Sequence, residues 1–212
     1  MNRPKFNVDV AVMTSGDESP LFRKVDVDTR EIVALSRSLV YGEGNRYVAS
    51  APDLERTEAV EEICGRVFAE LPVQAGWCFG DGKKMNGVEW HKSSEVVVAC
   101  TDCVLILGDS RDIDADVYDS SRAVALALDA GEAVELCAGT LHLAPLAVHE
   151  KFAAAIILPR GTNAPLAGGI DGTLRAVNKW LLVHPENTAG IAAGGKAGVA
   201  GANIALTGYE SE

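Results

Sequence analysis

The chain has 212 residues, a length that suits one domain with a sizeable core, and 48% of them are hydrophobic. Its 19 Lys and Arg against 30 Asp and Glu give a formal net charge of −11, which repels phosphate backbones and anionic lipid surfaces. We therefore expect neither nucleic acid nor a membrane as a partner. No apolar run approaches the roughly 20 residues of a membrane helix, and no secretory signal is visible. The sequence thus predicts a cytoplasmic protein whose five cysteines are reduced thiols.

The first 72 residues show a helical hydrophobic period. Asp28 is placed to cap a helix whose apolar residues run from Ile32 to Val40. Asp53 is placed to cap a second helix, in which apolar residues recur at intervals of three and four as far as Phe68. Residues 1–72 are therefore predicted to form a helical N-terminal extension.

Short apolar runs replace this period from residue 73 onward, each broken by glycine, aspartate, serine or proline. Consecutive short strands of this kind predict an antiparallel sandwich or barrel rather than alternating βαβ units. We expect residues 73–160 to form this core within a single domain spanning 1–212. The runs are 73–79, 85–91, 95–107, 123–128, 133–137, 141–148 and 152–158.

Residues 161–212 are predicted to hold one helix and a glycine-rich tail. The apolar spacing over 171–182 fits an amphipathic helix that ends before Pro185. On such a helix Lys179 would lie on a solvated face and Trp180 would anchor the core.

The tail contains Gly190–Ala197, which resembles a phosphate-binding loop. Ala197 stands where that loop needs a hydroxyl group for magnesium, and no apolar strand leads into the segment. We therefore expect 189–201 to be a flexible tail and the apolar run 204–206 to return to the sheet as an edge strand.

The segment 89–95 carries the clearest chemical signal. Glu89 and His91 are two residues apart, so on a strand both side chains leave the same face. The Lys92–Ser94 segment can turn the chain and bring Glu95 beside them from the next strand. His142, at the mouth of another apolar run, supplies a fourth group. Imidazole nitrogens and carboxylate oxygens suit a borderline divalent cation, and two carboxylates balance its charge.

A plainer alternative exists for each of these residues. An exposed hairpin also places polar side chains on its solvent face, and a histidine at a strand end also bonds a backbone carbonyl. His149, in a predicted turn, and His184, at a predicted helix end, are left out of the metal set. Cys100 and Cys103 have CxxC spacing, but three residues apart on an extended strand they face opposite sides and cannot share one metal.

The same residues resemble the two motifs of the cupin superfamily, His-x-His-x3or4-Glu and Gly-x5-Pro-x-Gly-x2-His-x3-Asn. Glu89, His91 and Glu95 fall on the ligand positions of the first motif, with Glu in place of the leading His. The second motif is matched at positions 131, 139 and 142, while Cys137 stands in place of Pro and Leu146 in place of Asn. The resemblance covers about residues 73–160. The remainder resembles an uncharacterised bacterial cupin-like family of about this length.

This resemblance implies a mainly β fold, a cupin-type double-stranded β-helix barrel with N-terminal helices and one C-terminal helix. It also implies a divalent metal ion, Mn, Zn, Fe or Ni, held by Glu89, His91, Glu95 and His142. Cupins often pair through their barrel edges, so we expect a homodimer.

We expect a metal-dependent enzyme that acts on a small polyhydroxylated or carboxylated substrate, such as a sugar or sugar acid. Sugar or sugar-phosphate isomerisation is the specific reaction predicted, with Glu95 or Glu89 as the catalytic base, because adjacent carbonyl and hydroxyl oxygens can chelate an open metal site. Lys83, by strand parity, and Arg160 and Asn163, at a strand end, are the predicted substrate-binding residues. The alternatives are an iron-dependent dioxygenase or lyase of the cupin type and a ligand-binding cupin without catalysis.

Overall fold

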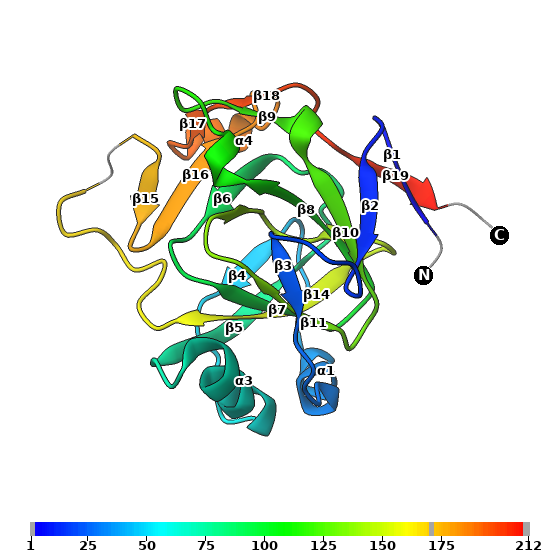
Figure 1. The fold of residues 1–212 in the computed structure, drawn as a ribbon, viewed down its shortest axis with the longest axis vertical. Helices are drawn as coiled ribbons and strands as arrows, with labels where there is room; N and C mark the ends of the chain where they lie inside the picture. Colours follow the sequence, from blue (N-terminus) through cyan, green and yellow to red (C-terminus); the bar gives the residue numbers. More distant parts are fainter. Residues whose placement is uncertain (1–2, 170–171, 210–212) are drawn as a thin grey trace.

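The computed structural model describes residues 3–169 and 172–209, and their fold is mostly β (Figure 1). The larger sheet is built from β3 (Phe22–Lys24), β4 (Arg46–Val48), β5 (Val73–Gly80), β7 (Glu95–Ala99), β11 (Ala133–Leu136) and β14 (Phe152–Pro159). Its strand order is β3-β11-β7-β14-β5-β4, with antiparallel pairing throughout. Consecutive strands in this sheet come from distant parts of the sequence, so the fold depends on long-range pairing.

A second sheet contributes to the same core. It comprises β2 (Ala11–Thr14), β8 (Cys103–Asp109), β10 (Val124–Leu128), β12 (Thr140–Leu141) and β13 (Leu146–Ala147). The order is β12-β8-β10-β2, and β13 also pairs with β8. β2 and β10 are parallel, whereas the other pairs are antiparallel.

The core between these sheets follows the alternation of their strands. Val97 and Ile156 of one sheet meet Leu105 and Leu126 of the other in one buried cluster. Phe152 is fully buried in the same cluster. Burial of each large aliphatic or aromatic side chain stabilises the fold by about 1.5–3 kcal/mol. This packed layer is the rigid base on which the polar residues of the strand ends are held.

Helices cover the outer face of the larger sheet, as Figure 1 shows for α1 and α3. They are α1 (Arg30–Ser36), α2 (Pro52–Glu55) and α3 (Glu58–Phe68). Ile32, Leu54 and Ile63 are fully buried against that face. No helix among the described residues has the length and apolar character needed to cross a membrane.

One of the two predicted helix caps is wrong. Thr29 is the N-cap position of α1, but its side chain makes no capping bond, and Asp28 Oδ1 accepts a hydrogen bond from the amide of Arg30, the first residue of the helix, at 3.1 Å. The N-cap of α3 is Thr57, whose hydroxyl accepts a hydrogen bond from the Val60 amide. Asp53 instead lies within α2, because Pro52 at its first position starts a separate short helix. The prediction for residues 1–72 also lacked strands β1 (Pro4–Phe6), β2, β3 and β4. These strands are only three or four residues long and pair with distant segments, so no local period reveals them.

The structure contains strands within each of the apolar runs predicted between residues 73 and 158, although two runs are divided. The run 95–107 turns between Ala99 and Cys103 and forms both β7 and β8. Cys100 therefore packs under the helices and Cys103 between the sheets. The run 141–148 likewise contributes separately to β12 and β13.

The helix predicted over 171–182 is wrong, and its first residue, Asp171, lies outside the described residues. The chain there forms β15 (Leu174–Ala176) and β16 (Lys179–Val183). Asn178, with φ of 57°, turns the chain between them in a left-handed conformation that an α-helix does not allow. β16 then pairs with β6 (Gly87–Trp90), so pairing with a distant strand overrides the local helical spacing.

The glycine-rich tail is also more ordered than predicted. α4 (Thr188–Ala192) leads to β17 (Lys196–Ala197), which pairs with β16, and to β18 (Val199–Ala200), which pairs with β9 (Tyr118–Asp119). β19 (Leu206–Tyr209) pairs with β1 (Pro4–Phe6) rather than with either large sheet. The two ends of the described chain therefore lie side by side (Figure 1).

Gly76 in β5 lies so close to β4 that an added Cβ would be 1.8 Å from the carbonyl oxygen of Val48. We expect Gly76→Ala to push β4 away and to lower the free energy of unfolding by about 1–3 kcal/mol, the usual cost of overpacking. Gly65 in α3 is the matched control, because an added Cβ there meets no atom within 4 Å. Gly65→Ala should raise the free energy of unfolding by about 0.5–1 kcal/mol. Urea titration measures both, and an unchanged Gly76→Ala protein would contradict the close approach.

Candidate metal centre

Two strand ends from different parts of the chain meet at the centre of the candidate site. The Glu89 amide donates to the His142 carbonyl at 2.6 Å, and the His142 amide donates to the Glu89 carbonyl at 2.9 Å. This antiparallel bridge makes the two residues direct neighbours on one face. His91, two residues after Glu89, is brought to the same site, as its sequence spacing predicts.

Glu95 lies between the two imidazoles. Its Oε2 is 3.3 Å from His91 Nε2, and its Oε1 is 3.4 Å from His142 Nε2. Glu89 approaches from the other side, with Oε1 4.0 Å from His142 Nε2. One ligand atom from each of Glu89, His91 and His142 lies within 4.8 Å of the others. The structure thus brings together all four residues that the sequence suggested as metal ligands.

Backbone carbonyls fix the orientation of both imidazoles. His91 Nδ1 lies 2.6 Å from the carbonyl oxygen of Asn178, and His142 Nδ1 lies 2.9 Å from that of Thr140. A carbonyl only accepts hydrogen bonds, so each Nδ1 carries a proton, and in the neutral ring Nε2 keeps its lone pair. Both Nε2 atoms are buried, and among the described residues neither makes a hydrogen bond; each faces an oxygen of Glu95 instead. Two buried lone pairs facing two carboxylates fit a divalent cation, and orientation through Nδ1 is the usual arrangement of metal-bound histidines.

The charges of the site are strongly coupled. Burial alone would raise the pKa of Glu95, but His142 and His91 hold it well below its usual range. Burial alone would lower the pKa of His142, but Glu95 and Glu89 raise it to about 9. In the absence of a metal, a second proton on His142, at Nε2, therefore supplies part of the positive charge that the carboxylates need, and a cation would take the place of this proton.

Lys179 is a site residue that was not predicted, because the sequence analysis placed it on the solvated face of a helix. Its ammonium group forms an ion pair with Glu89 Oε2, and only 23% of its side chain is exposed. Burial alone would lower the pKa of Lys179, but Glu89 more than offsets this and raises it. Because Leu181 pairs with Glu89, Lys179 lies diagonally across from Glu89 on the same face of the sheet. Reading 179–183 as a strand beside 87–90 would have revealed this contact.

A cavity of about 160 Å³ opens onto these residues. Its apolar wall includes Val97, Leu105 and Ile156, which belong to the core between the sheets. The residues that line it are Tyr47, Cys78, Glu89, Glu95, Val97, Leu105, His142, Leu143, Ala144, Pro145, Ile156, Asn163 and Lys179. An ion held by the histidines would thus face a small, partly apolar chamber.

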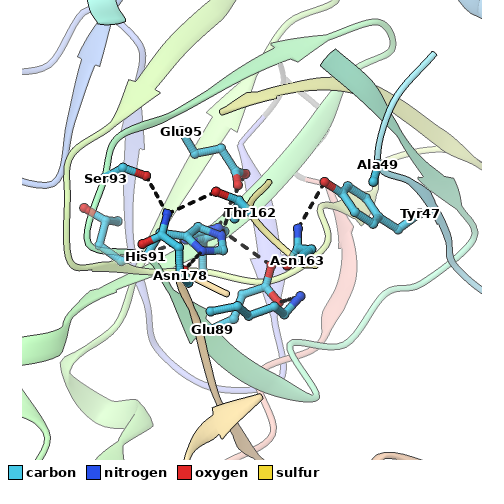
Figure 2. Close-up of polar contacts among 12 residues, drawn as sticks. Tyr47, Ala49, Glu89, His91, Ser93, Glu95, Thr162, Asn163 and Asn178 are labelled. Atoms are coloured by element: carbon cyan, nitrogen blue, oxygen red, sulfur yellow. Dashed lines mark hydrogen bonds and ion pairs between the residues drawn. The ribbon is translucent and has the colours of Figure 1, made fainter. Parts of the chain in front are cut away.

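Of the predicted substrate-binding residues, only Asn163 lines the cavity. Its amide Nδ2 donates to the Tyr47 hydroxyl at 3.2 Å, as Figure 2 shows. Burial raises the pKa of the Tyr47 phenol above its usual range, and the charge of Glu95 adds to the shift. Tyr47 was missed because it lies on a three-residue strand, β4, far away in sequence.

The structure places Lys83 and Arg160 away from this cavity. Lys83 is exposed and does not line the cavity, because β6 begins only at Gly87 and the left-handed Asn86 interrupts the alternation before it. Arg160 forms an ion pair with Glu55 at 3.0 Å, beside a different surface pocket under α3.

A family model described as "Domain of unknown function (DUF4867)" matches residues 23–204. The chain belongs to the DUF4867 family. The DUF4867 match takes in the four candidate ligands together with Lys179. No curated protein matches the chain.

Solved structures similar to this DUF4867 chain are cupin proteins. Oxalate decarboxylase from Bacillus subtilis, a protein with Mn(II) centres, is 10% identical with a TM-score of 0.33 over 57% of this chain and 26% of its own. EvdO2 from Micromonospora carbonacea var. aurantiaca, complexed with 2-oxoglutarate, is 15% identical with a TM-score of 0.40 over 53% and 65%. RmlC from Streptococcus suis, complexed with dTDP-D-xylose, is 13% identical with a TM-score of 0.33 over 46% and 51%. The DUF4867 chain thus spans about a quarter of the length of the decarboxylase, and these likenesses concern part of the fold alone.

We expect the protein, purified without added metal, to contain a divalent ion that His91→Ala and His142→Ala both remove, because each substitution deletes one of the two buried lone pairs. Elemental analysis measures the metal content per chain. His149→Ala is the control, since the His149 side chain is 73% exposed and lies outside the site. Full metal content in both the His91 and His142 variants would contradict the assignment.

Proposed function

We propose that the protein is a metal-dependent enzyme and that its reaction is the isomerisation of a sugar or sugar phosphate. The observation that carries this proposal is the pair of buried imidazole Nε2 atoms that face carboxylate oxygens beside a small cavity. This donor set is suited to hold a divalent ion and to leave coordination positions open toward the cavity.

His91, His142 and Glu95 are proposed as the groups that hold the ion. Glu95 has this role because its two oxygens face the two Nε2 atoms. A bound divalent cation supplies Lewis-acid chemistry that polarises a substrate carbonyl. The carbonyl partners of His91 and His142 keep both rings in the tautomer that presents Nε2.

Glu89 is proposed as the group that moves the proton. It lines the cavity beside the ligand set, and Lys179 holds its Oε2. In an aldose–ketose isomerisation Glu89 would take the proton from C2 and return it to C1, while the hydroxyl proton of O2 passes to the neighbouring O1. Lys179, Tyr47 and Asn163 offer a cation, a hydroxyl and an amide to the substrate oxygens along the same wall.

The size of the cavity limits the part of the substrate that enters. A cavity of about 150 Å³ holds benzene, and this one measures about 160 Å³. The cavity therefore suits the reacting end of a sugar, about six non-hydrogen atoms, with the rest of the molecule outside. The cytoplasmic location and the homodimer stay predictions from sequence.

Glu89→Gln and Glu95→Gln separate the two carboxylate roles. We expect Glu89→Gln to retain the metal and to lose about 10²- to 10⁴-fold in turnover, the usual contribution of a general base. Glu95→Gln should lose the metal itself. Exchange of the C2 proton in deuterated water, measured by NMR over a panel of aldoses and ketoses, reports turnover, and elemental analysis reports metal. Glu150→Gln, at an exposed turn, serves as the control. No exchange with any member of the panel, with the native metal bound, would exclude the isomerase.

One observation favours a second candidate, an iron-dependent dioxygenase. Two histidines and one carboxylate, here His91, His142 and Glu95, form the type of ligand set used by non-heme iron oxygenases. The proposed isomerase works equally well without dioxygen and tolerates several divalent metals. Turnover that requires both iron and dioxygen would instead select the oxygenase. Turnover measured in an anaerobic chamber and in air, with iron- and manganese-loaded protein, distinguishes them. Saturable binding without any turnover would indicate a ligand-binding cupin.

A further inference from the structure

We propose that Asn178 is a positioning residue for the metal centre, acting on His91 through its backbone carbonyl. The inference rests on the metal centre proposed above and assigns a role to a turn outside the ligand set. The contact itself is short, since His91 Nδ1 lies 2.6 Å from the Asn178 carbonyl oxygen. This carbonyl therefore selects the tautomer and the ring orientation of one ligand.

The side chain of Asn178 fixes this carbonyl in place from several sides. Its Oδ1 accepts a hydrogen bond from the Lys92 amide at 2.9 Å. Its Nδ2 donates to Ser93 Oγ at 2.9 Å and to Thr162 Oγ1 at 3.1 Å. Figure 2 shows the amide between these two hydroxyls, beside the His91 ring. One side chain thus joins the turn between β6 and β7, which carries His91, to the loop after β14.

The backbone of the turn extends this connection to the rest of the site. Asn178 has a φ of 57°, a conformation that asparagine tolerates better than most residues. The carbonyl of the preceding Val177 accepts a hydrogen bond from the backbone N–H of Asn163 at 3.0 Å. This bond connects the cavity wall to the same turn. The next residue, Lys179, forms the ion pair with Glu89. The turn therefore contacts a ligand, the proposed proton-transfer group and the cavity wall.

Substitutions of Asn178 and Thr162 test this role. Asn178→Gly keeps the left-handed backbone and the carbonyl but removes the three side-chain hydrogen bonds. Asn178→Asp keeps the size of the side chain but removes the two donated bonds. We expect both variants to bind Co²⁺ about 10- to 100-fold more weakly than the wild type, as for other groups that orient metal ligands. Thr162→Val, which removes one acceptor, should weaken binding in the same direction, whereas Thr162→Ser, which keeps the hydroxyl, should restore it.

The readouts are the Co²⁺ dissociation constant, from competition with a chelator, and the visible absorption spectrum of the bound Co²⁺. A change in the spectrum reports altered coordination, which a loss of stability alone would not produce. Asn86→Gly is the matched control, because Asn86 is also left-handed, with φ of 59°, and its side chain bonds Asn203 away from the ligands. We expect Asn86→Gly to leave the Co²⁺ affinity and the spectrum unchanged.

The outcomes separate this inference from the proposed function. A wild-type protein that binds no Co²⁺ would overturn the metal centre, and the role of Asn178 with it. A wild type that binds Co²⁺, together with Asn178 variants of unchanged affinity and spectrum, would overturn only the role of Asn178. An Asn86→Gly protein that loses affinity as Asn178→Gly does would also overturn it, since the effect would then come from general loosening. Weakened binding confined to the Asn178 and Thr162→Val variants, with an altered spectrum, supports the proposal.

Discussion

The site depends on compensation of two nearly buried carboxylates. Glu89 and Glu95 both face the same pair of imidazoles, and the side chain of Glu95 is only 6% exposed. A buried carboxylate without a partner would cost several kcal/mol, so the fold can close over this pair only if positive charge lies beside it. Lys179 supplies this charge beside Glu89. Beside Glu95, the carboxylates raise the pKa of His142, which favours the positively charged form of its imidazole. A divalent cation between the histidines would satisfy the same requirement.

The two sheets make this arrangement possible because they keep the polar strand ends at the edge of an apolar core. The bridge between Glu89 and His142 fixes their spacing through backbone hydrogen bonds rather than through flexible side chains. Beneath them, Val97, Leu105 and Ile156 form both the cavity wall and part of the core between the sheets. The shape of the cavity is therefore tied to the packing of the core, whose side chains have little freedom to move.

The parts of the site that could be predicted from sequence are those set by local geometry. Glu89 and His91 share a face because strand side chains alternate, and this holds wherever the strand lies in the fold. The same rule failed at Lys83 because Asn86 is left-handed and ends the alternation. Lys179 was not predicted as a site residue for a different reason. An apolar residue at about every third position suits both a helix and an irregular hairpin, and only the pairing of β16 with β6 decides between them.

The residues that sequence could not place are those joined by long-range contacts. Tyr47 reaches the cavity because β4 pairs with β5, and the short strand has no signal of its own. His91 obtains its orientation from Asn178, 87 positions further along the chain. Both contacts depend on which strands become neighbours, a property of the whole fold rather than of any local period. Glu89, His91 and Glu95 can be recognised as a group in the sequence because their spacing is local. His142, the groups that orient the ligands and those that shape the cavity come together only once the strands are paired.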